Sequence, residues 1–148
     1  MQGKLGLTED CCTFDLSQAC PSFLHTLSVA HSMLCSRVSN RALIINADAL
    51  TSLINPLDRS LVALHGDAGV AAIIERSDAN TGVDFFKFGT DGSQFHRIAV
   101  PAGGARKPSD SQTAQVFTDL AGCQRNLDQL YMDGPAIFHF AIHKILEQ

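Results

Sequence analysis

Long apolar runs are missing from this sequence, and so are long runs of one charge. No window approaches the roughly 18 apolar residues of a membrane-spanning helix. The formal net charge is −4, and acidic and basic residues are mixed along the chain. This pattern lacks the basic surface that is typical of proteins that bind nucleic acids. We therefore expect neither a membrane nor a nucleic acid as a partner.

The remaining composition is that of an ordinary globular protein. Of the 148 residues, 45% are hydrophobic and 18% are charged. This balance separates the chain from disordered proteins, and its length suits one domain. Internal repeats and low-complexity tracts are absent from the sequence.

The cysteines follow no recognisable pattern of disulfides or zinc ligands. There are five of them, at positions 11, 12, 20, 35 and 123, and their spacing fits no zinc ribbon. The first residues lead into a mixed stretch rather than the apolar segment of a signal peptide. We expect free thiols in a reducing cytoplasm, most of them packed as small buried hydrophobes.

Predicted helices and strands alternate along the chain. Apolar residues at positions 23, 27, 30 and 34 predict a helix from Phe23 to about Ser36. A second apolar helix is expected from Pro135 to the C-terminus. Short apolar runs predict strands at 12–16, 42–47, 61–64, 70–74, 82–88 and 127–132, and the run at 42–47 is continuous enough to expect burial on both faces. Residues 93–124 are rich in Gly, Pro, Ser and Asp and predict a long loop. The alternation favours an α/β layered architecture.

Cys20 stands at the beginning of the first predicted helix. Pro21 suits the first helical position, which places Cys20 at the helix cap. Unpaired N–H groups and the helix dipole favour negative charge at such a position, and the thiolate is the nucleophilic form of cysteine. Chemistry alone therefore nominates Cys20 as a nucleophile, with a structural cysteine as the commoner alternative.

Seven segments, in order and in register, resemble the ketoacyl synthase III family of condensing enzymes. Residues 14–23 are similar to the family's F-D-x-x-x-A-C-x-G-F around its nucleophile, and residues 27–30 to its L-S-x-A. The other similar segments are 58–60 (D-R-S), 66–71 (G-D-A-G-V-A), 90–93 (T-D-G-S), 101–104 (P-A-G-G) and 132–138 (M-D-G-P-A-I-F). The resemblance covers nearly the whole chain.

The resemblance implies an α/β, thiolase-like layered fold that is incomplete in this chain. Residues 1–131 would form part of the N-terminal half, carrying the nucleophile and the 93–124 loop region, and residues 132–148 would begin the C-terminal half. It implies an acyltransferase of fatty-acid or related biosynthesis, in which Cys20 takes an acyl group from acyl-CoA. The acyl group then passes to a carbanion made by decarboxylating malonyl-acyl carrier protein. No cofactor is implied besides these substrates, and the complete enzyme is expected to be a cytoplasmic homodimer.

Four further residues match family positions near the substrate. Arg59 matches the arginine that contacts the coenzyme A nucleotide, and the alternative is a solvated turn residue. His65 replaces a large apolar residue near the acyl pocket, which suggests either a more polar acyl group or a histidine satisfied at the core or rim. Phe23 and Gly134 occupy matched motif positions and are expected to contact substrate.

The sequence also departs from the family pattern. Ser22 replaces the glycine two residues after the cysteine, and Pro135 replaces a residue that is often asparagine. Met1 falls inside the family pattern, and the later P-H-Q-A-N and N-[TS]-S segments, which carry the histidine and asparagine for decarboxylation, are not found in these 148 residues. We expect the isolated chain not to complete condensation. The alternative is a truncated, non-catalytic chain that associates with another chain.

Other chemistry is less well supported by the sequence. His139 and His143 have the spacing of a metal pair, but no H-E-x-x-H pattern or third ligand accompanies them, so no metal is expected. The turn at 66–69 lacks the lysine of a phosphate-binding loop. A self-contained thiol enzyme would need His25, His31 or His65 as a base, and His25 is expected on a different helix face from Cys20.

Overall fold

The computed structural model describes residues 1–77 and 82–146, with side chains to residue 144 in the last helix. The chain forms two compact units. Unit 1 comprises Met1–Asn46 and Gly69–Phe86, and unit 2 comprises Ala47–Ala68 and Lys87–Gln148. Both contain helices and strands, so the predicted mixture of α and β structure is confirmed.

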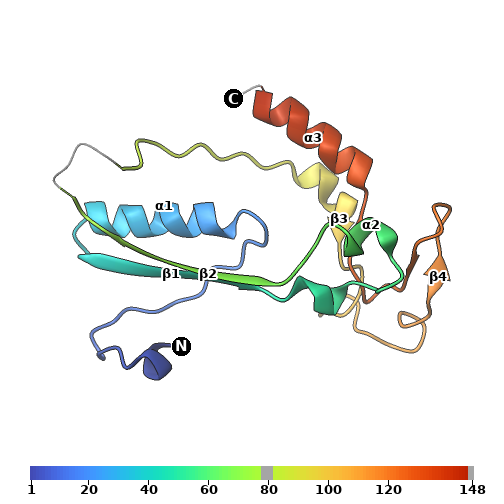
Figure 1. The fold of residues 1–148 in the computed structure, drawn as a ribbon, viewed down its shortest axis with the longest axis horizontal. Coiled ribbons are helices and arrows are strands. Elements are labelled where there is room, and N and C mark those ends of the chain that lie inside the picture. Colours follow the sequence, from blue (N-terminus) through green and yellow to red (C-terminus); the bar gives the residue numbers. More distant parts are fainter. Residues whose placement is uncertain (78–81, 147–148) are drawn as a thin grey trace. The chain divides into compact units, whose positions relative to one another are not determined.

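Unit 1 is built on a helix and a two-stranded sheet. Its elements are a 3₁₀ helix at Gln2–Leu5, helix α1 at Ser22–Cys35, strand β1 at Arg41–Asp48 and strand β2 at Ala68–Glu75. The Arg41 guanidinium lies 2.9 Å from the Glu75 carboxylate, so the first residue of β1 lies beside the last residue of β2 and the strands are antiparallel. Helix α1 lies along one face of this sheet (Figure 1).

The two faces of the sheet differ in exposure. Ile44 is 2% exposed, and Asn46 on the same face donates a hydrogen bond to the Ser22 hydroxyl of α1. The opposite face carries Leu43 and Ile45, which are 42% and 43% exposed, and Ile73, which is 68% exposed. The strand prediction for 42–47 is therefore confirmed, whereas the expected burial on both faces is wrong for the described residues.

Unit 2 has shorter elements around a small apolar core. They are 3₁₀ helices at Leu50–Leu53 and Gly92–Arg97, helices α2 (Arg59–Val62) and α3 (Gly134–Leu146), and strands β3 (Ile98–Ala99), β4 (Phe117–Thr118), β5 (Gln124–Arg125) and β6 (Tyr131–Met132). Strand β3 pairs antiparallel with β6, and β4 pairs antiparallel with β5. The core consists of Ile54, Leu61 and Leu130.

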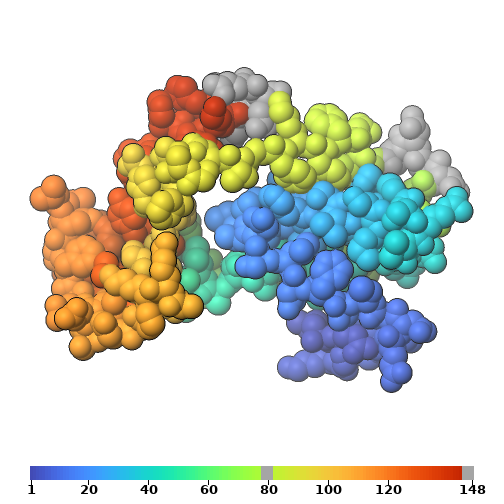
Figure 2. Space-filling view, turned by 180° about the vertical axis from the view of Figure 1, so that it is seen from behind, coloured from blue at the N-terminus to red at the C-terminus, as the bar shows by residue number. Residues whose placement is uncertain are grey.

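The region predicted as a long loop is ordered by its acidic side chains. Asp110 accepts hydrogen bonds from the backbone N–H groups of Gln112 and Thr113, each at 2.8 Å. The Thr113 hydroxyl lies 3.1 Å from the carboxylate of Asp128, and Thr113 is 1% exposed. Figure 2 shows this region in yellow to orange. Within the described residues, local hydrogen bonds rather than long ladders therefore order this loop region.

Helix predictions are confirmed more often than strand predictions. The structure contains the helix predicted from Phe23, the apolar helix after Gly134, and strands at 42–47 and 70–74; residues 147–148 lie outside the described part. Residues 61–64 are not a strand, because Asp58 caps α2 by accepting the Ser60 N–H at 3.1 Å. Segment 127–132 forms a strand only at Tyr131–Met132, and 12–16 and the described 82–88 form no strand. No described helix has the length and apolar character needed to cross a membrane.

Candidate active site

Cys20 lies in a tight turn that leads into α1. The Ser22 N–H donates to the Ala19 carbonyl at 2.9 Å, and Ala19 adopts a φ of +48°. A positive φ is uncommon outside glycine and costs free energy that the surrounding structure must supply. Helix α1 begins at Ser22 with Pro21 as its N-cap, so Pro21 and Cys20 each stand one position earlier than predicted. The Cys20 side chain is exposed.

The N-terminus of α1 is available to an anionic group. Its N-cap residue is Pro21, and no side chain caps this helix end. The first N–H groups of an α-helix have no partner within the helix, and together they carry a partial positive charge. A thiolate or an oxyanion beside Cys20 would therefore be stabilised by backbone groups.

Ser22 connects this helix end to the sheet. Its hydroxyl accepts a hydrogen bond from the side-chain amide of Asn46, near the end of β1. The serine that replaces a family glycine therefore has a structural role in this chain. Sequence reasoning missed Asn46, since nothing in a continuous apolar strand indicates a contact with a distant helix end.

The histidines of α1 point to other groups. His25 Nδ1 lies 3.1 Å from the Pro21 carbonyl oxygen, and His31 Nε2 lies 3.6 Å from the Cys35 sulfur. Within residues 1–77 and 82–146, the Cys20 thiol makes no hydrogen bond to either ring. Unit 1 therefore offers no thiol–imidazole pair at the predicted nucleophile.

The thiols are less buried than their chemistry suggested. All five cysteines are free; Cys123 is buried, and the exposed ones are Cys11, Cys12, Cys20 and Cys35. The expectation that most would be buried is wrong. Phe23, in the first turn of α1, is 36% exposed and shares unit 1 with Cys20.

The other three predicted site residues belong to unit 2. Arg59 is the exposed first residue of α2, and its Nη2 lies 3.7 Å from the point that a Cβ on Gly122 would occupy. His65 is half-buried, and its Nδ1 lies 3.2 Å from the Leu61 carbonyl; since a carbonyl only accepts, Nδ1 carries the proton. Gly134 begins α3. The structure thus groups Cys20 with Phe23, and Arg59 with His65 and Gly134.

A carboxylate organises the beginning of α3. Asp133 accepts the Ala136 N–H at 3.1 Å, and this hydrogen bond holds the pKa of Asp133 below its ordinary value, with the Arg97 guanidinium at 2.5 Å adding to the effect. Further along α3, the rings of His139 and His143 lie 4.0 Å apart between centroids. In the described part of the chain, no group of three or more His, Cys, Asp or Glu side chains could hold a metal ion.

Comparisons with known proteins agree with the motifs around Cys20. The family model of 3-oxoacyl-[acyl-carrier-protein (ACP)] synthase III matches residues 14–92. The chain is 34% identical to a β-ketoacyl-[acyl-carrier-protein] synthase III of Campylobacter fetus and 32% identical to one of Fusobacterium nucleatum, each over 142 residues. These matches cover 96% of this chain and 40% of each relative. The chain therefore spans about 40% of the length of these curated relatives.

Solved structures give the same match. A 3-oxoacyl-(acyl-carrier-protein) synthase III structure aligns with a TM-score of 0.93 and 27% identity, covering 97% of this chain and 43% of that one. The enzyme of Pseudomonas aeruginosa aligns with a TM-score of 0.70 and 28% identity, covering 96% of this chain and 38% of its own. The fold is thus a mixed α/β, partial thiolase-like domain.

Proposed function

The chain belongs to the 3-oxoacyl-[acyl-carrier-protein] synthase III family, and on that premise we propose that Cys20 is a nucleophile that accepts an acyl group from acyl-CoA. The observation that carries this proposal is the place of Cys20. It follows a residue held at a φ of +48° and directly precedes the uncapped N-terminus of α1. A fixed backbone and unpaired N–H groups are what a thiolate nucleophile and a developing oxyanion require.

The first step is acyl transfer to sulfur. The Cys20 thiolate attacks the carbonyl carbon of the acyl-CoA thioester, a new C–S bond forms, and the carbonyl electrons move to oxygen. Backbone N–H groups beside Cys20 stabilise that oxyanion. As the carbonyl re-forms, the C–S bond to coenzyme A breaks, and the departing thiolate takes up a proton.

The second step belongs to the complete enzyme. Malonyl-acyl carrier protein loses CO₂, the resulting carbanion attacks the acyl group on Cys20, and the Cys20 thiolate leaves, giving a 3-oxoacyl product. The family segments with the histidine and asparagine for this step are not found in these 148 residues. We expect the isolated chain to accept an acyl group without condensing it.

The remaining site residues would bind the substrate. Arg59 would contact the coenzyme A nucleotide, because its planar cation can stack on adenine or pair with phosphate. Phe23, His65 and Gly134 would border the acyl group and its channel. In the complete enzyme, a cytoplasmic homodimer that uses acyl-CoA and acyl carrier protein, residues 1–131 would belong to the N-terminal half and residues 132–148 to the start of the C-terminal half.

Intact mass spectrometry tests the nucleophile. The chain is incubated with acetyl-CoA and longer acyl-CoAs, and a mass gain of one acyl group is expected. Because Cys35 is exposed as well, Cys35→Ala is the matched control and should retain the gain, whereas Cys20→Ala should lose it. Acylation that persists in Cys20→Ala would exclude Cys20 as the acceptor.

A second candidate is a non-catalytic chain that associates with another chain. The exposed apolar face of the β1–β2 sheet, with Leu43, Ile45 and Ile73, favours it, because such faces promote association. Light scattering after size-exclusion chromatography measures the oligomeric state. A monodisperse monomer with one sharp unfolding transition would contradict this candidate.

A further inference from the structure

Unit 2 contains a buried arginine between two carboxylates. Arg125 of β5 is 4% exposed, and its Nη2 pairs with Asp119. Its Nη1 lies 3.4 Å from Asp58, which is 0% exposed. The guanidinium carbon also lies 5.2 Å from the centre of the Tyr131 ring. One cation thus holds two acidic residues that are far apart along the chain.

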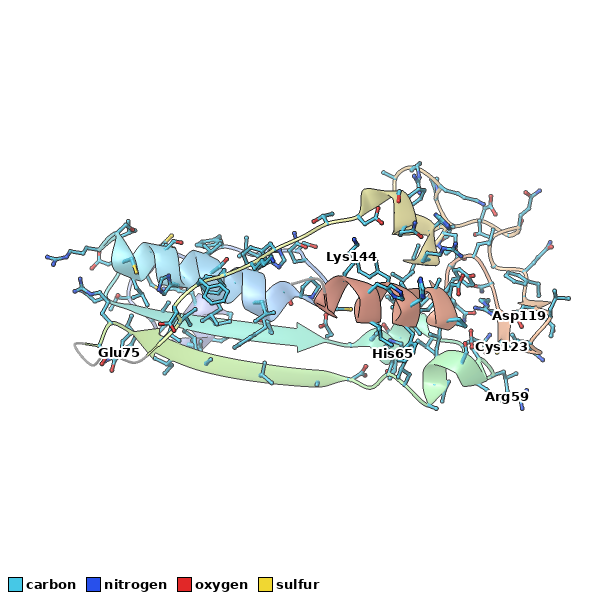
Figure 3. The ribbon with its side chains drawn as sticks, turned by 90° about the horizontal axis from the view of Figure 1, so that it is seen from above. Arg59, His65, Glu75, Asp119, Cys123 and Lys144 are labelled. Carbon is cyan, nitrogen blue, oxygen red and sulfur yellow. The ribbon has the colours of Figure 1, made fainter. Side chains whose placement is uncertain are left out.

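Each of these two carboxylates also holds a segment of backbone that lies next to Arg59. Asp58 is the N-cap of α2 and immediately precedes Arg59. Asp119 accepts the N–H groups of Ala121 and Cys123 at 2.9 Å each, which folds the turn between β4 and β5. In that same turn, a Cβ on Gly122 would lie 3.7 Å from Nη2 of Arg59, so the guanidinium is close to the turn. Figure 3 shows Arg59, Asp119 and Cys123 at one end of unit 2.

Stability alone does not explain the buried charges. Removing ions from water is costly, and apolar residues of similar size are often equally stabilising or better. Moreover, Nε and Nη1 of Arg125 and Oδ2 of Asp58 are buried without a hydrogen-bond partner, so the pairing is incomplete. A role of such networks that is better attested than stability is to fix one element in register with another.

We propose that Arg125 is a positioning residue for Arg59. Through Asp58 it fixes the start of α2, and through Asp119 it fixes the turn at 119–123, so the Arg59 guanidinium is held between them before any ligand binds. The result is a preformed cationic site for the coenzyme A nucleotide. The ligand part of this inference rests on the proposed function, in which Arg59 contacts that nucleotide.

Arginine side-chain NMR tests the positioning without a ligand. In ¹H–¹⁵N spectra of the full chain, the Arg59 Nε–Hε signal should be resolved. In Arg125→Lys it should move to the random-coil position, because a single ammonium group cannot pair with two carboxylates as the planar guanidinium does. Asp119→Asn, which keeps an acceptor for the turn N–H groups, covers the case in which Arg125→Lys does not fold. Arg41→Lys, in an exposed ion pair of unit 1, is the matched control. An unmoved Arg59 signal in a folded Arg125→Lys or Asp119→Asn variant would overturn the positioning role.

Calorimetry with coenzyme A separates this role from that of Arg59 itself. Arg59→Ala should weaken binding roughly tenfold, as expected for a lost charge-assisted contact. Arg125→Lys should weaken binding by a similar factor in the natural chain and add little in the Arg59→Ala background. Equal losses in both backgrounds would overturn positioning through Arg59. If Arg59→Ala binds coenzyme A normally, the nucleotide assignment fails, and the NMR experiment alone decides the positioning.

Discussion

Units 1 and 2 hold the chain together by different means. In unit 1, apolar strands lie against one long helix, and the face of the sheet away from that helix remains exposed. In unit 2, most elements are short, and carboxylates fold the turns by accepting backbone N–H groups two to four residues away, as at Asp58, Asp110 and Asp119. Local hydrogen bonds need no distant partner, whereas an apolar strand face is stabilised only when something covers it.

Truncating a buried core side chain should change the free energy of unfolding more than any other substitution described here. Leu61 is 0% exposed in the core of unit 2, so Leu61→Ala should lower the free energy of unfolding by about 2–5 kcal/mol. Leu64→Ala, at a 65% exposed site nearby, is the control and should change it by less than about 0.5 kcal/mol. Urea denaturation measures both.

Urea denaturation also tests whether the exposed face of the β1–β2 sheet is covered in solution. Ile73→Ala should resemble the Leu64 control, because Ile73 is 68% exposed. A loss as large as that of Leu61→Ala would mean that the sheet face is covered in solution, as association of chains would bring about.

Removing a buried hydrogen bond should cause the next largest loss in the free energy of unfolding. Thr113 is buried, and its hydroxyl accepts the Asp110 N–H at 2.8 Å. Thr113→Val keeps the shape but leaves that N–H and the nearby Asp128 carboxylate without the hydroxyl, at a cost of about 1–3 kcal/mol. Thr118→Val, at an exposed strand position, is the matched control and should be nearly neutral. If the two variants unfold at the same urea concentration, the turns do not stabilise unit 2 as described.

Lowering the pH should destabilise unit 2 more than unit 1, by less than the substitutions above. Among the residues that the structure describes, the carboxyls with lowered pKa values are Asp67, Asp91, Asp110 and Asp133, and all of them belong to unit 2. For Asp110 the causes are hydrogen bonds from the N–H groups of Thr113 and then Gln112, which lower the pKa from 3.8. A lowered folded pKa stabilises the fold above the unfolded value, and this contribution disappears as the pH falls through the folded pKa. Hydrogen exchange should therefore show residues 110–115 losing protection below about pH 4, and Asp110→Asn should remove that pH dependence.

The smallest effect is expected at the exposed ion pair of unit 1. The Arg41 and Glu75 side chains are 69% and 58% exposed, so solvent screens their attraction. Glu75→Gln should change the free energy of unfolding by no more than about 0.5 kcal/mol. A larger loss would indicate that the strand ends of unit 1 depend on this pair.

Sequence reasoning succeeded where the signal is local and repeated. Helix α1 and strand β1 follow from apolar periodicity and from a continuous apolar run. It failed at α2, because the apolar residues after Ser60 resemble a strand, although Asp58 before them is a good N-cap and could have been recognised. Two-residue strands such as β4 are too short to show any period.

Some residues of the candidate site also have a local signal in the sequence, and others do not. Cys20 stays a prediction, made because it precedes a helix and belongs to a segment that resembles a family motif. Asn46 and Arg125 could not be predicted, since each acts on a residue that is remote in sequence and near only after folding. A buried arginine also has no signature in the sequence, because arginine is ordinarily exposed.

The backbone at Ala19 restricts which sequences this turn can accept. With a φ of +48°, position 19 suits glycine, asparagine and aspartate and disfavours valine, isoleucine and threonine, although the site is exposed and offers room for any of them. Variation at this position is therefore limited by a torsion angle and not by packing. Since the same angle directs the chain into Cys20, a valine, isoleucine or threonine at position 19 would disturb the backbone that carries the thiol.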